Sequence, residues 1–183
     1  DGKFGAWLEG NAVVTPDGNV ADLLRVDYAP GPEYAALIRL RDSVSFDPFD
    51  PEKDFVRMPG GAKKFTVRDD SLSGRYWSLV NYVTQEWAGK QNPAWVRNTL
   101  ALSSSPNLQE WTVHRTVLHH PDIAKHGFQY ADWLFDGNDI VLLSRTAYDD
   151  NGTGAHNCHD ANYMTFHRIK DFRKALTEQA GNR

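Results

Sequence analysis

The chain has 183 residues, which is enough for one domain with a hydrophobic core. Its 20 basic and 24 acidic residues give a net charge of -4, and no basic run resembles a nucleic-acid-binding surface, so we expect no nucleic-acid partner. No apolar stretch reaches the about 18 residues that span a bilayer, so no membrane partner is expected, and the single Cys158 excludes an internal disulfide.

Strand-like runs recur along the chain, in pairs joined by a turn that contains glycine. In a first unit, residues 7–15 and 20–28 flank the turn at 16–19 (Pro-Asp-Gly-Asn), and residues 34–40 follow. In a second, residues 64–69 and 76–83 flank the turn at 72–75, and residues 98–104 and 110–118 follow. In a third, residues 128–134 and 139–146 flank the turn at 135–138, and residues 161–169 follow. Only residues 170–179 have a composition that favours a helix.

The turn glycines set the spacing of this repeat. Gly18, Gly74 and Gly137 lie 56 and 63 residues apart, and each follows Asp or Ser, a pair typical of tight hairpins. Three units, at about 1–60, 61–122 and 123–183, each with three or four antiparallel strands, are the sequence pattern of propeller blades. We therefore predict an all-β fold of antiparallel β-propeller blades with a short C-terminal helix or tail. A β-sandwich is the alternative.

About three blades form an incomplete ring, since propellers close with four to eight. Apolar blade flanks then stay open unless a longer parent protein or a second copy covers them. The chain begins Asp1-Gly2-Lys3, without an initiator Met or a leader pattern. We favour a C-terminal fragment of a longer parent, with self-association across the open flanks as the alternative.

One local motif supports the blade prediction. Residues 105–111, Ser-Pro-Asn-Leu-Gln-Glu-Trp, resemble the turn between outer strands of propeller glycosidases and a degenerate form of the sialidase Asp-box. Ser105 and Asn107 can hold a tight turn through their own backbone, and Trp111 can pack between sheets. The role of such a motif is structural.

A wider resemblance covers most of the chain. Residues 7–11, 60–66, 126–133 and 155–162 together resemble bacterial proteins of the sialidase-like or exo-α-sialidase family. This resemblance implies a carbohydrate-processing propeller, a carbohydrate partner, and a periplasmic or extracellular location. Arg25, Arg39, Arg97 and Arg145 lie in or beside predicted strands, and no local motif assigns them a role.

The first strand of each unit carries polar side chains where a propeller lines its central channel. These are Glu9 and Asn11, Lys63 and Lys64, and Gln129 and Asp132. Buried charge is costly unless it is paired or used, so a ligand site is one explanation and hydrogen bonding between blades is the other. Glu9 and Asp132 are the candidate acid/base pair, because glycoside hydrolysis generally uses two carboxyl groups.

The densest polar loop is 156–162, His-Asn-Cys-His-Asp-Ala-Asn. His159 with Asp160 can act as a general base, and His156 and Asn162 can bind a sugar. His156, His159 and Asp160 are also a weak candidate set for a divalent metal, although we expect no cofactor. Outside the loop, His126 precedes an inner strand and is a further catalytic candidate, and Arg145 can clamp a sugar carboxylate.

Two functions follow from these patterns. The first is a carbohydrate-active enzyme, a glycoside hydrolase or polysaccharide lyase, that uses carboxylates and histidines at one mouth of the channel. The second is a propeller fragment that binds carbohydrate or another protein without catalysis, with an aromatic platform formed by Trp87, Trp95 or Tyr148.

Overall fold

The computed structural model describes residues 4–28, 31–41, 45–150 and 154–178. Eleven strands form three antiparallel sheets. The first sheet contains β1 (Ala6–Val14), β2 (Val20–Asp27), β3 (Tyr34–Leu40) and β4 (Phe55–Arg57); the second contains β5 (Thr66–Asp70), β6 (Arg75–Asn81), β7 (Thr99–Ser105) and β8 (Thr112–His119); the third contains β9 (Gly127–Asp136), β10 (Asp139–Ala147) and β11 (Tyr163–Ile169). The helices are short: α1 (Pro51–Asp54), η1 (Pro93–Trp95), η2 (Phe172–Lys174) and α2 (Ala175–Glu178).

In each sheet the strands are hydrogen-bonded in chain order, as in a propeller blade. The three predicted turn glycines all adopt positive φ, at 82° for Gly18, 61° for Gly74 and 62° for Gly137. The predicted all-β blades and the short C-terminal helix are therefore confirmed. The strand β4 was not predicted, because it has only three residues, too few to show an alternating pattern in the sequence.

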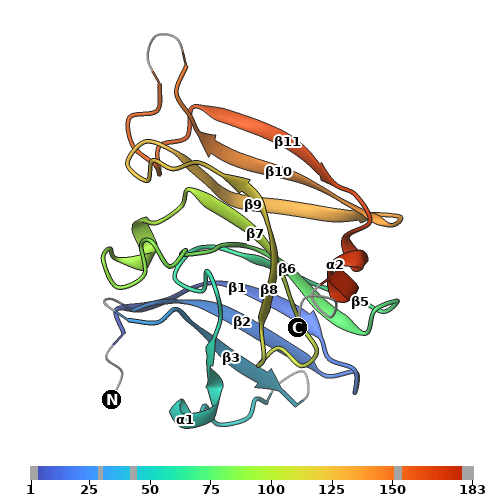
Figure 1. Cartoon of the computed structure of the whole chain (residues 1–183). Helices are drawn as coiled ribbons and strands as arrows, with labels where there is room; N and C mark the ends of the chain where they lie inside the picture. The colour runs from blue at the N-terminus through green and yellow to red at the C-terminus, as the bar shows by residue number, and fades with distance from the viewer. Residues whose placement is uncertain (1–3, 29–30, 42–44, 151–153, 179–183) are drawn as a thin grey trace.

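The three sheets stack, with the first and third at opposite ends and the second between them (Figure 1). Alternation along β6 divides its side chains between two cores. Tyr76 and Val80 face the first sheet, while Trp77 and Leu79 face the third. Because the second sheet is covered on both faces, all seven residues of β7 are buried.

The first strand of each sheet is its innermost one, and polar side chains bridge these strands. The Asn11 side chain on β1 donates to the Phe65 carbonyl at 3.0 Å and accepts from the Val67 amide at 3.3 Å. The Trp133 indole on β9 donates to the Thr66 carbonyl at 3.2 Å. These bonds satisfy polar groups that the stacked sheets remove from water.

The predicted turn at residues 105–111 forms as expected. The Asn107 side chain accepts hydrogen bonds from the amides of Gln109 and Glu110, at 3.0 and 2.9 Å. Trp111 packs against the first core, and its indole donates to the Leu108 carbonyl at 3.0 Å. The motif therefore has a structural role between the outer strands β7 and β8.

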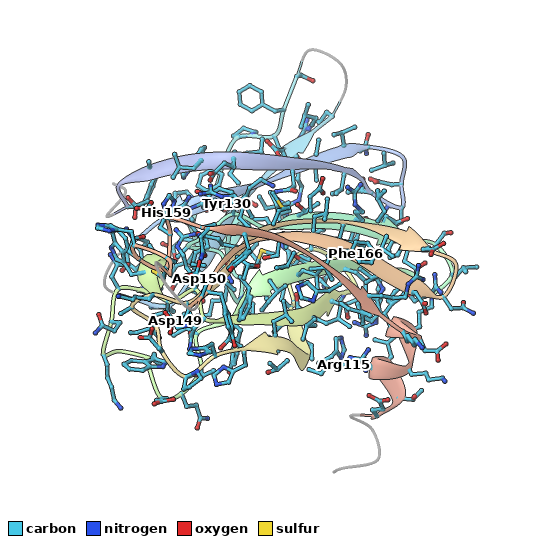
Figure 2. The ribbon with its side chains drawn as sticks, turned by 90° about the horizontal axis from the view of Figure 1, so that it is seen from above. Arg115, Tyr130, Asp149, Asp150, His159 and Phe166 are labelled. Atoms are coloured by element: carbon cyan, nitrogen blue, oxygen red, sulfur yellow. The ribbon has the colours of Figure 1, made fainter. Side chains whose placement is uncertain are left out.

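The ring is incomplete, and the third sheet has an uncovered apolar face. Paired and alternating positions place four exposed side chains on this outer face: Leu134, Leu143, Met164 and Phe166, with exposures of 59%, 49%, 64% and 63%. Phe166 lies along β11 at the surface of the stack (Figure 2). Among the described helices, none has the length and hydropathy of a membrane span.

Candidate functional site

Three arginines, one from each blade, converge at one end of the stacked sheets. Arg25 lies on β2, Arg97 just before β7 and Arg145 on β10. Two of them lie against the ring of Tyr130 on β9 in cation–π contacts. The guanidinium carbons of Arg145 and Arg97 are 4.9 and 5.9 Å from the centre of the ring. We call Arg25, Arg97 and Arg145 the arginine cluster.

Two β-bulges aim side chains at this cluster. In β9 the pairing with β10 skips Tyr130 and Ala131, and Tyr130 takes a φ of 51°. In β1 the pairing with β2 skips Glu9, which takes a φ of 20° and lies 3.1 Å from Arg25 Nη1. Bulges re-aim single side chains, and positive φ in a non-glycine residue costs about 1–3 kcal/mol, which is why such geometry gathers at functional sites.

Gln129 connects the cluster to the 156–162 loop. Its buried side-chain oxygen accepts from Arg97 Nη1 at 2.9 Å, and its nitrogen donates to the carbonyls of Cys158 and His159 at 2.9 and 2.7 Å. Arg145 Nη2 also donates to the His159 carbonyl, at 3.2 Å. The His159 imidazole thereby lies 3.4 Å from the Tyr130 hydroxyl, and Figure 2 shows the two side by side.

Buried positive charge dominates the electrostatics of this site. Arg97 is only 4% exposed, its Nε has no hydrogen-bond partner, and burial lowers the pKa of its guanidinium below the ordinary value. Glu9 forms an ion pair with Arg25, but within the described ranges neither Arg97 nor Arg145 forms an ion pair with a carboxylate. A buried cation without a counter-charge, as at Arg97, is unfavourable unless an anion binds.

A hollow of about 330 Å³ opens at the cluster. Arg25, Arg97 and His159 line it, together with the carboxylate-bearing Asp27 and the indole of Trp95, which is 58% exposed. The hollow has room for a small polar ligand rather than a long chain. Larger hollows of about 620 and 720 Å³ lie elsewhere, lined by residues 31–33 with 83 and 88–93, and by an aromatic group around Trp7 and Phe55.

Of the predicted site residues, four belong to this site: Glu9, Gln129, Arg145 and His159. Asp132 does not pair with a cluster arginine; its carboxylate lies 3.2 Å from Arg68 Nη2 and is 73% exposed. Asn11 is used between blades, as described above. Lys63 is fully buried, where its ammonium is paired with Glu33 and donates to the Pro93 carbonyl at 2.9 Å.

The remaining predicted residues hold loops. His126 is buried between Asp122 and Asp149, and the Asn162 side chain bonds the amide and the carbonyl of Tyr148 at 3.0 and 2.9 Å. Asp160 accepts from the Asn157 amide group at 2.7 Å and lies 3.5 Å from His159. His156 is exposed, and it is absent from the three-donor group of possible metal ligands found among the described residues.

Sequence reasoning missed Tyr130, Asp27 and the joint role of Arg25 and Arg97. The position of Tyr130 depends on the bulge in β9, and no turn residue or glycine marks that bulge in the sequence. The fourth arginine considered, Arg39, forms an ion pair with Asp54 and stands outside the cluster. The alternation of side chains along a strand did not tell the cluster arginines from Arg39, because a bulge changes which face the residues beyond it occupy.

No protein-family model matches the sequence, and no curated protein sequence matches it. Among solved structures, the fold is similar to the α-L-arabinofuranosidase Arb93A from Fusarium graminearum in complex with an iminosugar inhibitor, with a TM-score of 0.54 and 7% identity. It is also similar to the Penicillium chrysogenum α-L-arabinanase complexed with arabinobiose, with a TM-score of 0.51 and 12% identity. Each match covers 91% of this chain and 46% of the other.

These likenesses concern the fold. At 7% and 12% identity they support propeller blades and carry over no site residue, and the chain spans less than half the length of these structural neighbours. These two neighbours are named as an arabinofuranosidase and an arabinanase, and neither is named as a sialidase, so the sialidase-like resemblance of the sequence stays a prediction.

Proposed function

We propose that this chain is part of a carbohydrate-active propeller that binds an acidic sugar at the arginine cluster and hydrolyses its glycosidic bond. The single observation that carries the proposal is the meeting of the buried Arg97 and the half-buried Arg145 over Tyr130, beside an open hollow, with no carboxylate partner for either arginine among the described residues. A guanidinium group matches the carboxylate of a uronic or sialic acid in shape and charge.

The residues around the hollow supply groups suited to the chemistry. Tyr130 can serve as the nucleophile, since sialidases use a tyrosine in place of a carboxylate. Glu9, held by Arg25, is the candidate base that takes up the phenol proton, and Asp27, which lines the hollow, is the candidate acid that protonates the leaving oxygen. Trp95 offers an exposed ring on which the apolar face of a sugar can stack.

Binding of matched ligands tests the proposal on the chain itself. Glucuronate and N-acetylneuraminate are titrated calorimetrically against their neutral methyl esters, which keep the ring and remove the charge. We expect the acids to bind and the esters to bind at least about tenfold more weakly, because a charged hydrogen bond contributes about 1.5–3 kcal/mol. Equal affinity for acid and ester would overturn the carboxylate role.

Two variants locate the site. Arg97→Lys keeps the charge but removes the planar fork, and it should weaken acid binding by about 10- to 100-fold. Arg39→Lys is the matched control, because Arg39 is paired with Asp54 outside the cluster, and its affinity should equal that of the unmodified chain.

Binding without catalysis is the second candidate, favoured by the exposed Trp95. Turnover of umbelliferyl glycosides separates the two. Hydrolysis that disappears in Tyr130→Phe while acid binding persists supports the enzyme. Tight binding without hydrolysis, lost in Trp95→Ala, supports a binding module.

A further inference from the structure

A pocket of about 620 Å³ opens between the first and second blades and adjoins the hollow at the arginine cluster. One wall is formed by residues 31–33, just before β3, and the other by residues 83 and 88–93, in the connection from β6 to β7 (Figure 1). Asn92 lines both cavities. A ligand in the hollow can therefore extend past Asn92 into this second cavity, which we call the side pocket.

The completely buried Lys63 ties the two walls of the side pocket together. Its ammonium group pairs with Glu33 on one wall and donates to the Pro93 carbonyl on the other, at 2.9 Å. The second carboxylate oxygen of Glu33 accepts from the Gly60 amide, also at 2.9 Å. Because a buried ion pair is costly to break, the walls keep a fixed separation and the carboxylate is oriented before a ligand binds.

The side pocket presents one acceptor and one donor that suit sugar hydroxyls. The Glu33 side chain is 10% exposed, and each of its oxygens can accept a further hydrogen bond. The side-chain oxygen of Asn92 accepts from the Ala94 amide at 3.0 Å, which orients the side chain, and its nitrogen has no hydrogen-bond partner among the described residues. Pro32 and Val83 add apolar surface for the C–H groups of a sugar ring.

The charges of the side pocket favour a neutral sugar. The positive charge of Lys63 is already paired with Glu33, and the other charged side chain among the described lining residues is the exposed Lys90. The Glu33 carboxylate repels a ligand carboxylate, whereas it accepts hydrogen bonds from hydroxyl groups. The side pocket therefore differs from the adjoining hollow, where Arg97 has no carboxylate partner among the described residues.

We propose that the side pocket is a second sugar-binding site continuous with the arginine cluster, and that the ligand is an oligosaccharide in which an acidic sugar is linked to a neutral one. The acidic sugar is the ligand of the function proposed above, on which this site rests, and it fills the hollow of about 330 Å³. The neutral sugar lies between the two walls of the side pocket, where its hydroxyls donate to Glu33. Asn92 donates to the oxygens near the junction of the two rings.

Calorimetric titration of the whole chain compares each acidic sugar with and without a neutral neighbour. The pairs are sialyllactose with the methyl α-glycoside of N-acetylneuraminate, and aldobiouronate (glucuronate linked to xylose) with methyl glucuronoside. We expect the oligosaccharide of the preferred acid to bind at least about tenfold more tightly than the single acidic sugar, because one molecule then fills both cavities. Digalacturonate, in which both sugars are acidic, should gain less than about threefold over galacturonate. Chromatography after each titration shows whether the sugar is intact; if it is cleaved, Tyr130→Phe is titrated instead.

Two substitutions to Trp in the same connection locate the second sugar. Ala88→Trp fills the side pocket from an exposed position and leaves the Lys63 pair untouched, so it should remove the gain and leave the affinity for the single acidic sugar unchanged. Gln85→Trp is the matched control, because Gln85 is also exposed but does not line the side pocket, and both affinities should stay unchanged. Asn92→Ser keeps an oxygen for the Ala94 amide and removes the amide donor, so it should weaken oligosaccharide binding by about 3- to 10-fold.

The outcomes separate this site from the proposed function. Equal affinity for the oligosaccharide and the single acidic sugar, or a gain that persists in Ala88→Trp, overturns the side pocket and leaves the acidic-sugar site in place. Oligosaccharide binding that Ala88→Trp abolishes, without binding of either single acidic sugar, supports the side pocket and overturns the proposed function. No binding of any of these sugars overturns both. Circular dichroism checks folding, and if Ala88→Trp does not fold, Asn92→Ser decides.

Discussion

Replacement of Arg173 by Gln tests how the C-terminal segment fastens the third blade to the second. Arg173 Nε and Nη2 donate to the two oxygens of Asp70 at 2.7 and 2.6 Å, across the ends of η2 and β5. Next to it, the buried Phe172 packs edge-on against Trp77 with ring centres 5.0 Å apart. The ion pair therefore joins residues that are distant in sequence at the border of the second core.

The magnitude follows from what the variant leaves behind. Asp70 is only 5% exposed, and breaking a buried pair by removing one partner costs about 3–5 kcal/mol. Ser73 continues to donate to Asp70 from its amide and hydroxyl, so we expect the lower value of about 2–3 kcal/mol. In a chain of this size each kcal/mol lowers the thermal midpoint by about 2–4 °C, hence by about 4–12 °C in total.

The assay is thermal and urea unfolding of the variant beside Arg168→Gln. Arg168 also contacts two aspartates, Asp136 and Asp139, but it is 40% exposed, and an exposed pair contributes about 0–1 kcal/mol. Equal losses of stability in the two variants would refute the reasoning that the Asp70 pair is buried and ties the blades together.

The pH dependence provides an internal check. Burial favours a raised pKa for Asp70, but hydrogen bonds from Arg173 and Ser73 and the charge of Arg173 outweigh it and lower the pKa below its ordinary value. A lowered carboxyl pKa contributes stability that is fully present above the unfolded value of about 3.9 and is lost as the pH falls below it. The difference between the unmodified chain and Arg173→Gln should therefore be full at pH 7 and shrink below about pH 4.

Two further substitutions test the site support and the open flank. In Gly127→Ala the new Cβ would lie 2.4 Å from the Cys158 carbonyl oxygen, so we expect the free energy of unfolding in urea to fall by about 1–3 kcal/mol and acidic sugars to bind more weakly. Gly74→Asn is the control, because Gly74 lies at a turn with open space around it, and it should change neither quantity by much. Phe166→Ser should reduce any self-association seen by light scattering over a concentration series, since burial of Phe166 in an interface would contribute about 1.5–3 kcal/mol. Leu72→Ser, at a distant hairpin turn, is the control and should leave self-association unchanged.

The blades were predictable because their signals are local. The turns at Gly18, Gly74 and Gly137 need positive φ, and the strands between them alternate or run apolar according to how many faces are covered. Likewise, the turn around Asn107 is held by contacts within a few residues. Such features depend on neighbours in sequence, so the sequence carries them in full.

The arginine cluster was only partly predictable. Glu9, Gln129, Arg145 and His159 were named because polar groups on inner strands and in a dense loop are conspicuous. Nothing in the sequence was a reason to select Tyr130 within the predicted strand, whereas the nearby Asp132 was selected because its carboxyl group can act as an acid or base. The bulge in β9 reverses this, because it turns Tyr130 to the cluster and leaves the Asp132 carboxylate exposed beside Arg68.

The sequence by itself determined the all-β architecture, the three turn-centred units and the incompleteness of the ring, since periodicity and turn chemistry act over a few residues. Only the tertiary structure decided that Arg97 and Arg145, from two different blades, meet over Tyr130, and that Arg25, from the remaining blade, lines the same hollow as Arg97. This cluster joins distant segments of the chain through blade stacking and bulges, and a shift of one residue in strand register sends a side chain to the opposite face.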